Sequence, residues 1–222
     1  MNGVGDAFSF QFKDPGWVGK IAVQALILII PIVGLIALAG WMLMTFDNLR
    51  AGRQELAPAG FHLGRGIGLF GTWFIYSFVL SLPGFVLSWG SAMSSFSNLS
   101  SSSYASHPYA FSTFNAPGSF LNLVGDLLLN FLLPSVIVMV YHYGFSRGMD
   151  VPRVWRLATS NVTNSIIGGL LFFVAGIIGG LGIVACCIGV FFTAAYSASV
   201  MVGVASWFER AQAVPPTPRP AA

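Results

Sequence analysis

Long apolar stretches separated by short polar segments set the pattern of the chain. Four of them carry no formal charge or only one, and they span residues 21–46, 67–89, 120–143 and 157–208. The fourth holds 52 uncharged residues. As one helix it would be ~78 Å long, whereas the hydrocarbon core of a bilayer is ~30 Å thick. It must therefore cross a membrane twice, and Gly179-Gly180-Leu181-Gly182 predicts where it turns.

The first stretch leaves the number of crossings open. Its 26 residues suffice for one tilted crossing, but Pro31 removes a helical hydrogen bond and can turn the chain. The sequence therefore predicts five crossings, or six if the first stretch turns at Pro31. An open sheet would leave unpaired backbone groups in lipid, and a membrane barrel would alternate in segments of about ten residues. The predicted fold is an all-α, polytopic bundle of transmembrane helices.

The composition agrees with a membrane protein and argues against soluble classes. Apolar residues make up 55% of the chain and charged residues only 8%, whereas soluble domains carry about 25% charged residues. So few charges cannot cover the surface of a compact soluble enzyme. The net charge of +3 fits loops that face anionic lipid. We expect no nucleic-acid partner, because no basic cluster interleaved with aromatic residues is present.

Basic residues concentrate in some connecting segments and avoid others. Arginines occur in residues 47–66, 144–156 and 209–222, whereas residues 90–119 contain no Lys or Arg. The positive-inside rule places the arginine-bearing segments, and with them the C-terminus, in the cytoplasm. The N-terminal segment with Lys13 and Lys20 obeys the rule only if there are six crossings. We therefore expect a multi-pass protein of the inner (cytoplasmic) membrane with both termini cytoplasmic.

Two segments stand apart from the predicted helices. Residues from about 90 to 119 form a serine-rich loop expected outside the cytoplasm, and the proline-rich residues 211–222 are expected to be a disordered tail. Residues 1–210 then make a single transmembrane helical domain. Asp150 followed by Pro152 predicts the start of a further short helix, which would lie at the membrane interface.

Ionisable groups give little sign of a catalytic centre. Six of the seven acids lie at the ends of apolar stretches or in loops, where solvated carboxylates are expected. His62, His107 and His142 lie on different segments, and no pair has the spacing of metal ligands. We therefore expect no catalytic, metal or cofactor-binding residue, and His142 fits an aromatic belt at the interface. The glycine-rich residues 64–68 lack the context of a dinucleotide motif and are predicted to form a flexible lead-in to the second stretch.

Asp126 is the acid that lies within an apolar stretch. A charge at the centre of a membrane helix costs about 2.5–3.5 kcal/mol on insertion scales, so such acids are functional candidates. Asn122 and Asn130 lie four residues to either side, and the three form a candidate intramembrane polar stripe on one helix face. Two interpretations stay open: hydrogen bonding to another helix, or contact with a proton or solute in a cavity of the bundle.

Small residues in the fourth stretch predict close helix packing. Gly176 and Gly180 form a Gly-x-x-x-Gly pair, and Ala195, Ser199 and Gly203 form a second small face at a spacing of four. Such faces let membrane helices approach closely. We expect these candidate packing residues at the seam between the two halves of the stretch, or at a contact with another subunit.

Two segments carry a family resemblance. Residues 8–17 read Phe-Ser-Phe-Gln-Phe-Lys-Asp-Pro-Gly-Trp and lead, through Lys20-Ile21, to Ile30-Pro31-Ile32-Val33-Gly34. Together with residues 187–196, this opening resembles the DUF4013 family of bacterial and archaeal multi-pass membrane proteins of unknown function. Ala195 stands where the family usually has a proline. The resemblance implies a helical bundle in a prokaryotic inner membrane and supplies no catalytic residues.

Three functions follow as hypotheses. The first is a non-catalytic accessory or scaffold subunit, whose partners are the lipid bilayer and either another membrane protein or a second copy of the chain. The second is a small solute or proton-coupled transporter or channel that uses the polar stripe around Asp126. The third is a lipid-handling membrane enzyme, which ranks last because no nucleophile and base pair is visible.

Overall fold

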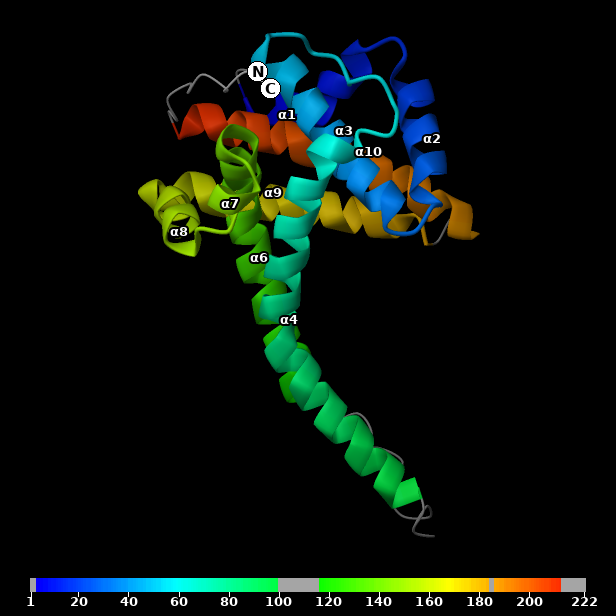
Figure 1. Ribbon diagram of the computed structural model, residues 1–222, viewed down its shortest axis with the longest axis vertical. Helices are drawn as coiled ribbons and strands as arrows, with labels where there is room; N and C mark the ends of the chain where they lie inside the picture. Colours follow the sequence, from blue (N-terminus) through cyan, green and yellow to red (C-terminus); the bar gives the residue numbers. More distant parts are fainter. Residues whose placement is uncertain (1–2, 100–115, 184–185, 213–222) are drawn as a thin grey trace. The chain divides into compact units, whose positions relative to one another are not determined.

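The computed structural model describes residues 3–99, 116–183 and 186–212, and every regular element in these residues is a helix (Figure 1). The longer helices are α2 (Trp17–Leu28), α3 (Val33–Arg50), α4 (Leu63–Leu99), α6 (Ala116–Tyr143), α9 (Val162–Leu181) and α10 (Cys186–Ala211). The shorter ones are α1 (Val4–Ser9), the 3-10 turn η1 (Phe10–Lys13), α7 (Phe145–Gly148) and α8 (Val151–Ser160). The predicted all-α fold is confirmed.

Four of the described helices are long and apolar enough to cross a membrane. These spans are Leu63–Trp89, Pro117–Tyr143, Val162–Leu181 and Gly189–Ala211. Contacts divide the chain into two compact units. Unit 1 comprises Met1–Trp73 together with Asn130–Ala222, and unit 2 is Phe74–Leu129. The protein is thus a helical membrane protein, while the prediction of a single domain over residues 1–210 stays a prediction.

The first apolar stretch turns at Pro31. Helix α2 ends at Leu28, α3 begins at Val33, and Ile32 between them has a φ of 64°. A Cβ on Gly34 would lie 2.4 Å from the carbonyl oxygen of Ile27, so only glycine allows the two helices to approach this closely after the turn. The alternative with a turn at Pro31 is therefore correct for the fold of this stretch.

Helices α9 and α10 form the hairpin that the length of the fourth stretch predicted, and they lie side by side in Figure 1. Helix α9 ends at Leu181, inside the glycine-rich segment where the break was expected. The close contact between the helices runs through Gly179, where a Cβ would lie 3.3 Å from the Ser197 side chain, and through Gly182, which faces Thr193.

Helix α10 lies at the centre of unit 1, where it contacts α1, α2, α3 and α9. The small face of α10 that the sequence predicted, formed by Ala195, Ser199 and Gly203, takes part in this packing. Ala195 and Ser199 are fully buried, and a Cβ on Gly203 would lie 2.4 Å from the carbonyl oxygen of Ala7 in α1. The N-terminal segment therefore packs directly on the last helix.

The start of α4 is a regular helix that packs on α3. The glycine-rich residues 64–68 are helical. A Cβ on Gly66 would lie 1.8 Å from the carbonyl oxygen of Ile36, and one on Gly40 would lie 2.0 Å from that of His62. The prediction of a flexible lead-in was wrong, because these glycines serve close backbone contact rather than conformational freedom.

Unit 2 is an antiparallel pair formed by the second part of α4 and the first part of α6. A Cβ on Gly125 would lie 2.6 Å from the carbonyl oxygen of Leu80, and one on Gly118 would lie 2.4 Å from the Ser88 hydroxyl. Helix α4 continues to Leu99 and α6 begins at Ala116, so the helices extend into residues predicted as a serine-rich loop. The remainder of that loop, residues 100–115, and most of the proline-rich tail lie outside the described residues.

The predicted short helix after Asp150 is present as α8. The Asp150 side chain caps it by accepting a hydrogen bond from the Arg153 backbone N–H at 3.3 Å. Val154 and Ala158 are buried, whereas Trp155 is exposed. This division into two faces suits a helix that lies along an interface.

Candidate functional site

A buried charge cluster forms where α3, α6 and α10 end. Glu209 on α10 is only 5% exposed and His142 on α6 only 8%. The Oε1 atom of Glu209 lies 2.5 Å from Nε2 of His142 and 3.3 Å from Nε of Arg50. One carboxylate is thereby held by a guanidinium from α3 and an imidazole from α6, which satisfies the requirement that buried charges be paired.

A second carboxylate extends the cluster to α4. The Tyr141 hydroxyl donates to Oδ1 of Asp47 at 2.6 Å, and the Arg65 guanidinium forms an ion pair with Oδ2 of the same residue. The guanidinium of Arg50 lies over the Tyr141 ring, 5.3 Å from its centroid. These contacts join the two carboxylates into one network, which we call the charge cluster: Asp47, Arg50, Arg65, Tyr141, His142 and Glu209.

The charge cluster corrects two expectations. Glu209 was expected to be a solvated acid and His142 a residue of an aromatic belt, but both are buried and paired with each other. One signal could have found them. The positive-inside rule assigns one side of the membrane to the stretch ends that carry Asp47, Arg65, His142 and Glu209. Pairing between the acidic and basic groups at these ends could therefore have been expected.

A second buried acid fixes the N-terminal segment. Asp14, expected to be solvated, is 3% exposed. Its Oδ2 accepts from Lys20 Nζ at 2.7 Å and from the Leu56 backbone N–H at 3.0 Å, and its Oδ1 accepts from the Gly16 N–H at 2.9 Å. Burial raises the pKa of Asp14, but the bonds from Lys20, Gly16 and Leu56 outweigh it, so the pKa lies below its usual value.

We expect the Asp14 contacts to make stability depend on acid pH. A carboxyl whose pKa is lowered by folding stabilises the fold above its unfolded value of 3.8 and loses that contribution as the pH falls through the folded value. The free energy of unfolding in detergent should therefore decline below pH 3.8 in the wild type. Asp14→Asn should cost about 1–2 kcal/mol at neutral pH and flatten this decline. An equal effect of Glu55→Gln, at an exposed position, would contradict the assignment.

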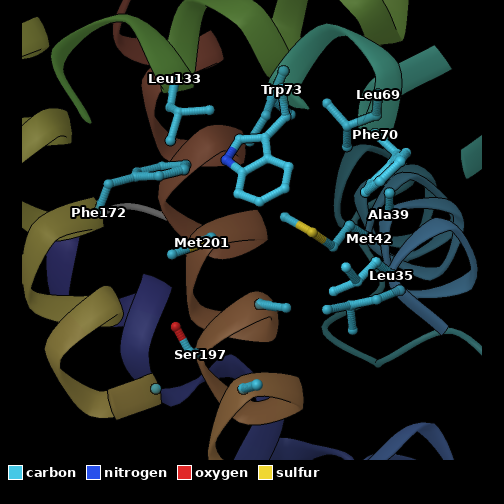
Figure 2. Close-up of a pocket in the computed structure, with 15 residues that line it drawn as sticks. Leu35, Ala39, Met42, Leu69, Phe70, Trp73, Leu133, Phe172, Ser197 and Met201 are labelled. Carbon is cyan, nitrogen blue, oxygen red and sulfur yellow. The ribbon is translucent and has the colours of Figure 1, made fainter. Parts of the chain in front are cut away.

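Unit 1 also contains an apolar cavity of about 260 Å³ (Figure 2). Five helices line it, with Leu35, Leu38, Ala39 and Met42 from α3, Leu69, Phe70 and Trp73 from α4, Leu133 and Ile137 from α6, Phe172 and Gly179 from α9, and Ala194, Ser197, Ala198 and Met201 from α10. Ser197 contributes the one hydroxyl, which donates to the carbonyl oxygen of Ala175 at 2.5 Å. The surface of the cavity is therefore almost entirely apolar.

The residues of the predicted polar stripe all lie on α6. Asn122 and Asp126 belong to unit 2 and Asn130 to unit 1. Because the span begins at Pro117, Asp126 lies well inside it and does not cap the helix. Its side chain is exposed, whereas Asn122 and Asn130 are half-buried. The Oδ1 atom of Asn122 is buried without a hydrogen-bond partner among the described residues.

The Gly-x-x-x-Gly pair lies away from the seam of the hairpin. A Cβ on Gly176 or Gly180 would have no atom within 4 Å, and both residues are exposed on α9. The seam is built by Gly179 and Gly182 instead. A role of Gly176 and Gly180 in contact with another subunit stays a prediction.

The described residues do not assemble a metal site, since they contain no group of three or more His, Cys, Asp or Glu side chains that could hold an ion. In the charge cluster both carboxylates are held by cations or by a hydroxyl. Such an arrangement joins helix ends by mutual neutralisation. It presents no carboxylate to the apolar cavity, whose lining contains no ionisable residue.

A comparison with protein families gives a match over residues 23–188 to a family described as "Protein of unknown function (DUF4013)". The match covers most of the chain. The protein belongs to the DUF4013 family. No significant match was found among curated proteins or among solved structures.

The family match divides the features described above. Helices α3, α6 and α9 and most residues that line the cavity lie within the DUF4013 region. Asp14 and Glu209 lie outside it. The acid that anchors the N-terminal segment and the acid that closes the charge cluster are thus features of this DUF4013 protein beyond the matched region.

Proposed function

We propose that this DUF4013 protein is a non-catalytic accessory or scaffold subunit of the inner membrane, with its arginine-bearing loops and C-terminus in the cytoplasm. The observation that carries the proposal is the open Gly-x-x-x-Gly face of α9. Small faces of this kind let a second helix approach closely in a membrane, where no hydrophobic force distinguishes a helix from lipid.

Three helical glycines of this chain show one use of small residues, which is close contact between helices. Gly34, Gly66 and Gly203 each meet the backbone of another helix, at distances that exclude a side chain. Gly176 and Gly180 have the four-residue spacing of a helix contact motif, but a Cβ on either would meet no atom within 4 Å. Their surroundings on α9 are apolar and exposed, including Phe173 and Ile177. A helix of another membrane protein, or of a second copy, fits this face.

The state of the ionisable groups supports a non-catalytic role. Catalysis needs a nucleophile, acid or base that faces a substrate. In the charge cluster, Glu209 is bound by His142 and Arg50, and Asp47 is bound by Tyr141 and Arg65. These groups serve to hold helix ends together, and this arrangement favours a structural role.

Photo-crosslinking in native membranes tests the proposal. A benzoylphenylalanine in place of Phe173, one helical turn before Gly176, should form adducts with a membrane protein. The double variant Gly176→Leu with Gly180→Leu should reduce these adducts about tenfold, which corresponds to ~1.4 kcal/mol of association free energy. The fold should survive, because both positions are exposed and a Cβ at either would meet no atom within 4 Å.

The matched control is the same probe in place of Val174, which lies on another side of α9 because successive residues turn by about 100°. Adducts from this position should be with lipid and should not change in the double variant. Exclusive labelling of lipid from the Phe173 position in the wild type would sink the proposal.

Transport is the second candidate, and the placement of Asp126 favours it. Asp126 is an exposed acid well inside a membrane span, and ionisable residues at such positions commonly mark the pathway of an ion or solute. Proton or solute flux into liposomes that contain the purified protein should then fall to background in Asp126→Asn. Flux that persists in this variant would show that the polar stripe is not the transport route. Absence of flux in the wild type would contradict the transport function and favour the scaffold role.

A further inference from the structure

We propose that the apolar cavity of unit 1 binds one acyl chain of a bilayer phospholipid. Its volume of about 260 Å³ exceeds that of an apolar cavity of about 150 Å³ that is known to bind benzene. This is room for a length of hydrocarbon chain and too little for a whole lipid. The proposal is independent of the Gly176 and Gly180 face, because it concerns a different surface of the chain.

The chemistry of the walls selects a hydrocarbon. Side chains of Leu, Ala, Met, Phe, Trp and Ile make up nearly the whole lining, and the cavity contains no ionisable group. The hydroxyl of Ser197 is already bonded to the carbonyl oxygen of Ala175. Apolar cavities of this size exclude water but take up apolar molecules. A polar solute would lose its hydrogen bonds to water and find no replacement here.

The cavity is also reachable from lipid. Trp73 on α4 and Leu35 on α3 belong to the lining and are 39% and 40% exposed. In Figure 2 the indole of Trp73 lies at the cavity beside Leu133 and Phe172, and Leu35 lies on the opposite side with Ala39 and Met42. The lining comes largely from helices that are long and apolar enough to cross a membrane, so acyl chains are the molecules expected around it.

Small residues keep the space open. Ala39 of α3 and Ala198 of α10 stand in the walls, where larger residues would fill the cavity and gain contacts. An unfilled void forfeits dispersion contacts of every atom around it and destabilises the fold in proportion to its volume. A chain from the bilayer restores these contacts without any transfer from water. We therefore expect a single phospholipid to stay with the protein through purification.

Native mass spectrometry of the detergent-purified full chain tests this. The wild type should retain one phospholipid, and Ala198→Met should reduce its occupancy about tenfold, because the added side chain occupies the space. Val174→Met is the matched control, since Val174 is exposed on α9 and lies outside the lining. It should retain the lipid. Ala39→Met places the same side chain in the cavity from α3. It keeps the test decisive if Ala198→Met does not fold.

Thermal unfolding supplies a second readout. Adding phospholipid to the delipidated wild type should raise the melting temperature, as for any ligand bound only by the folded state, and the rise should shrink in both cavity variants. If instead Ala198→Met and Ala39→Met fold, retain as much phospholipid as the wild type and gain stability without lipid, the cavity is an unoccupied void and the proposal is overturned.

Discussion

Replacing Glu209 with leucine should lower the free energy of unfolding by about 3 kcal/mol, the lower end of the range for breaking a buried ion pair by removing one partner. The substitution leaves His142 without its anion in a buried position. Arg50 loses the same partner but keeps part of its side chain exposed, which limits the loss. Denaturant titration in detergent micelles measures the change.

Two further variants separate the pairing from general damage. Glu55→Leu alters an exposed acid in the loop between α3 and α4 and should change stability little. Glu209→Leu combined with His142→Leu replaces the pair by apolar side chains and should recover part of the loss, because the buried imidazole that contacted Glu209 is removed together with it. Additive losses in the double variant would show that the two residues do not act as a pair.

Gly66→Ala should also cost about 3 kcal/mol, at the upper end of the usual range for overpacking. A Cβ at this position would lie 1.8 Å from the carbonyl oxygen of Ile36 and 2.7 Å from the backbone nitrogen of Gly40. Both are backbone atoms, which cannot rotate aside as a flexible side chain could. Helix α3 would have to move away from α4, and the packing between them would loosen.

Gly64 offers the matched control two residues earlier on the same helix. A Cβ there would meet no atom within 4 Å. Gly64→Ala should therefore leave stability unchanged or raise it by up to about 1 kcal/mol, because alanine is the better helix former. The same loss in both variants, measured by denaturant titration, would mean that close approach at Gly66 is not what stabilises the pair.

The outline of the fold could be predicted from the sequence because it depends on local composition. The break near Gly179 and the cap at Asp150 follow from neighbouring residues, and both are confirmed. For the first stretch the sequence left two alternatives, and the structure has the one with a turn at Pro31. The limits of α4 were missed, because serine-rich residues after Gly90 carry no apolar signal although the helix continues to Leu99.

The candidate sites were far less accessible from the sequence. The charge cluster joins residues that are up to 162 positions apart, from Asp47 to Glu209, and no spacing rule links them. The cavity combines side chains of five helices, each of which reads as an ordinary apolar residue in its own stretch. Only the stripe on α6 and the small faces of α9 and α10 could be found, because they repeat every four residues on a single helix.

The sequence by itself determined that the chain dissolves in lipid and forms helices, since too few charges are present to cover a soluble surface and the backbone must satisfy its own hydrogen bonds there. Tertiary structure alone decided which small residues are buried against another helix and which remain exposed. It also decided which acids pair with a basic side chain. Gly66 and Gly64, or Glu209 and Glu55, are equivalent along the chain. They differ only in what another helix brings within a few ångströms, and that distance sets both the cost of a side chain and the strength of a charge interaction.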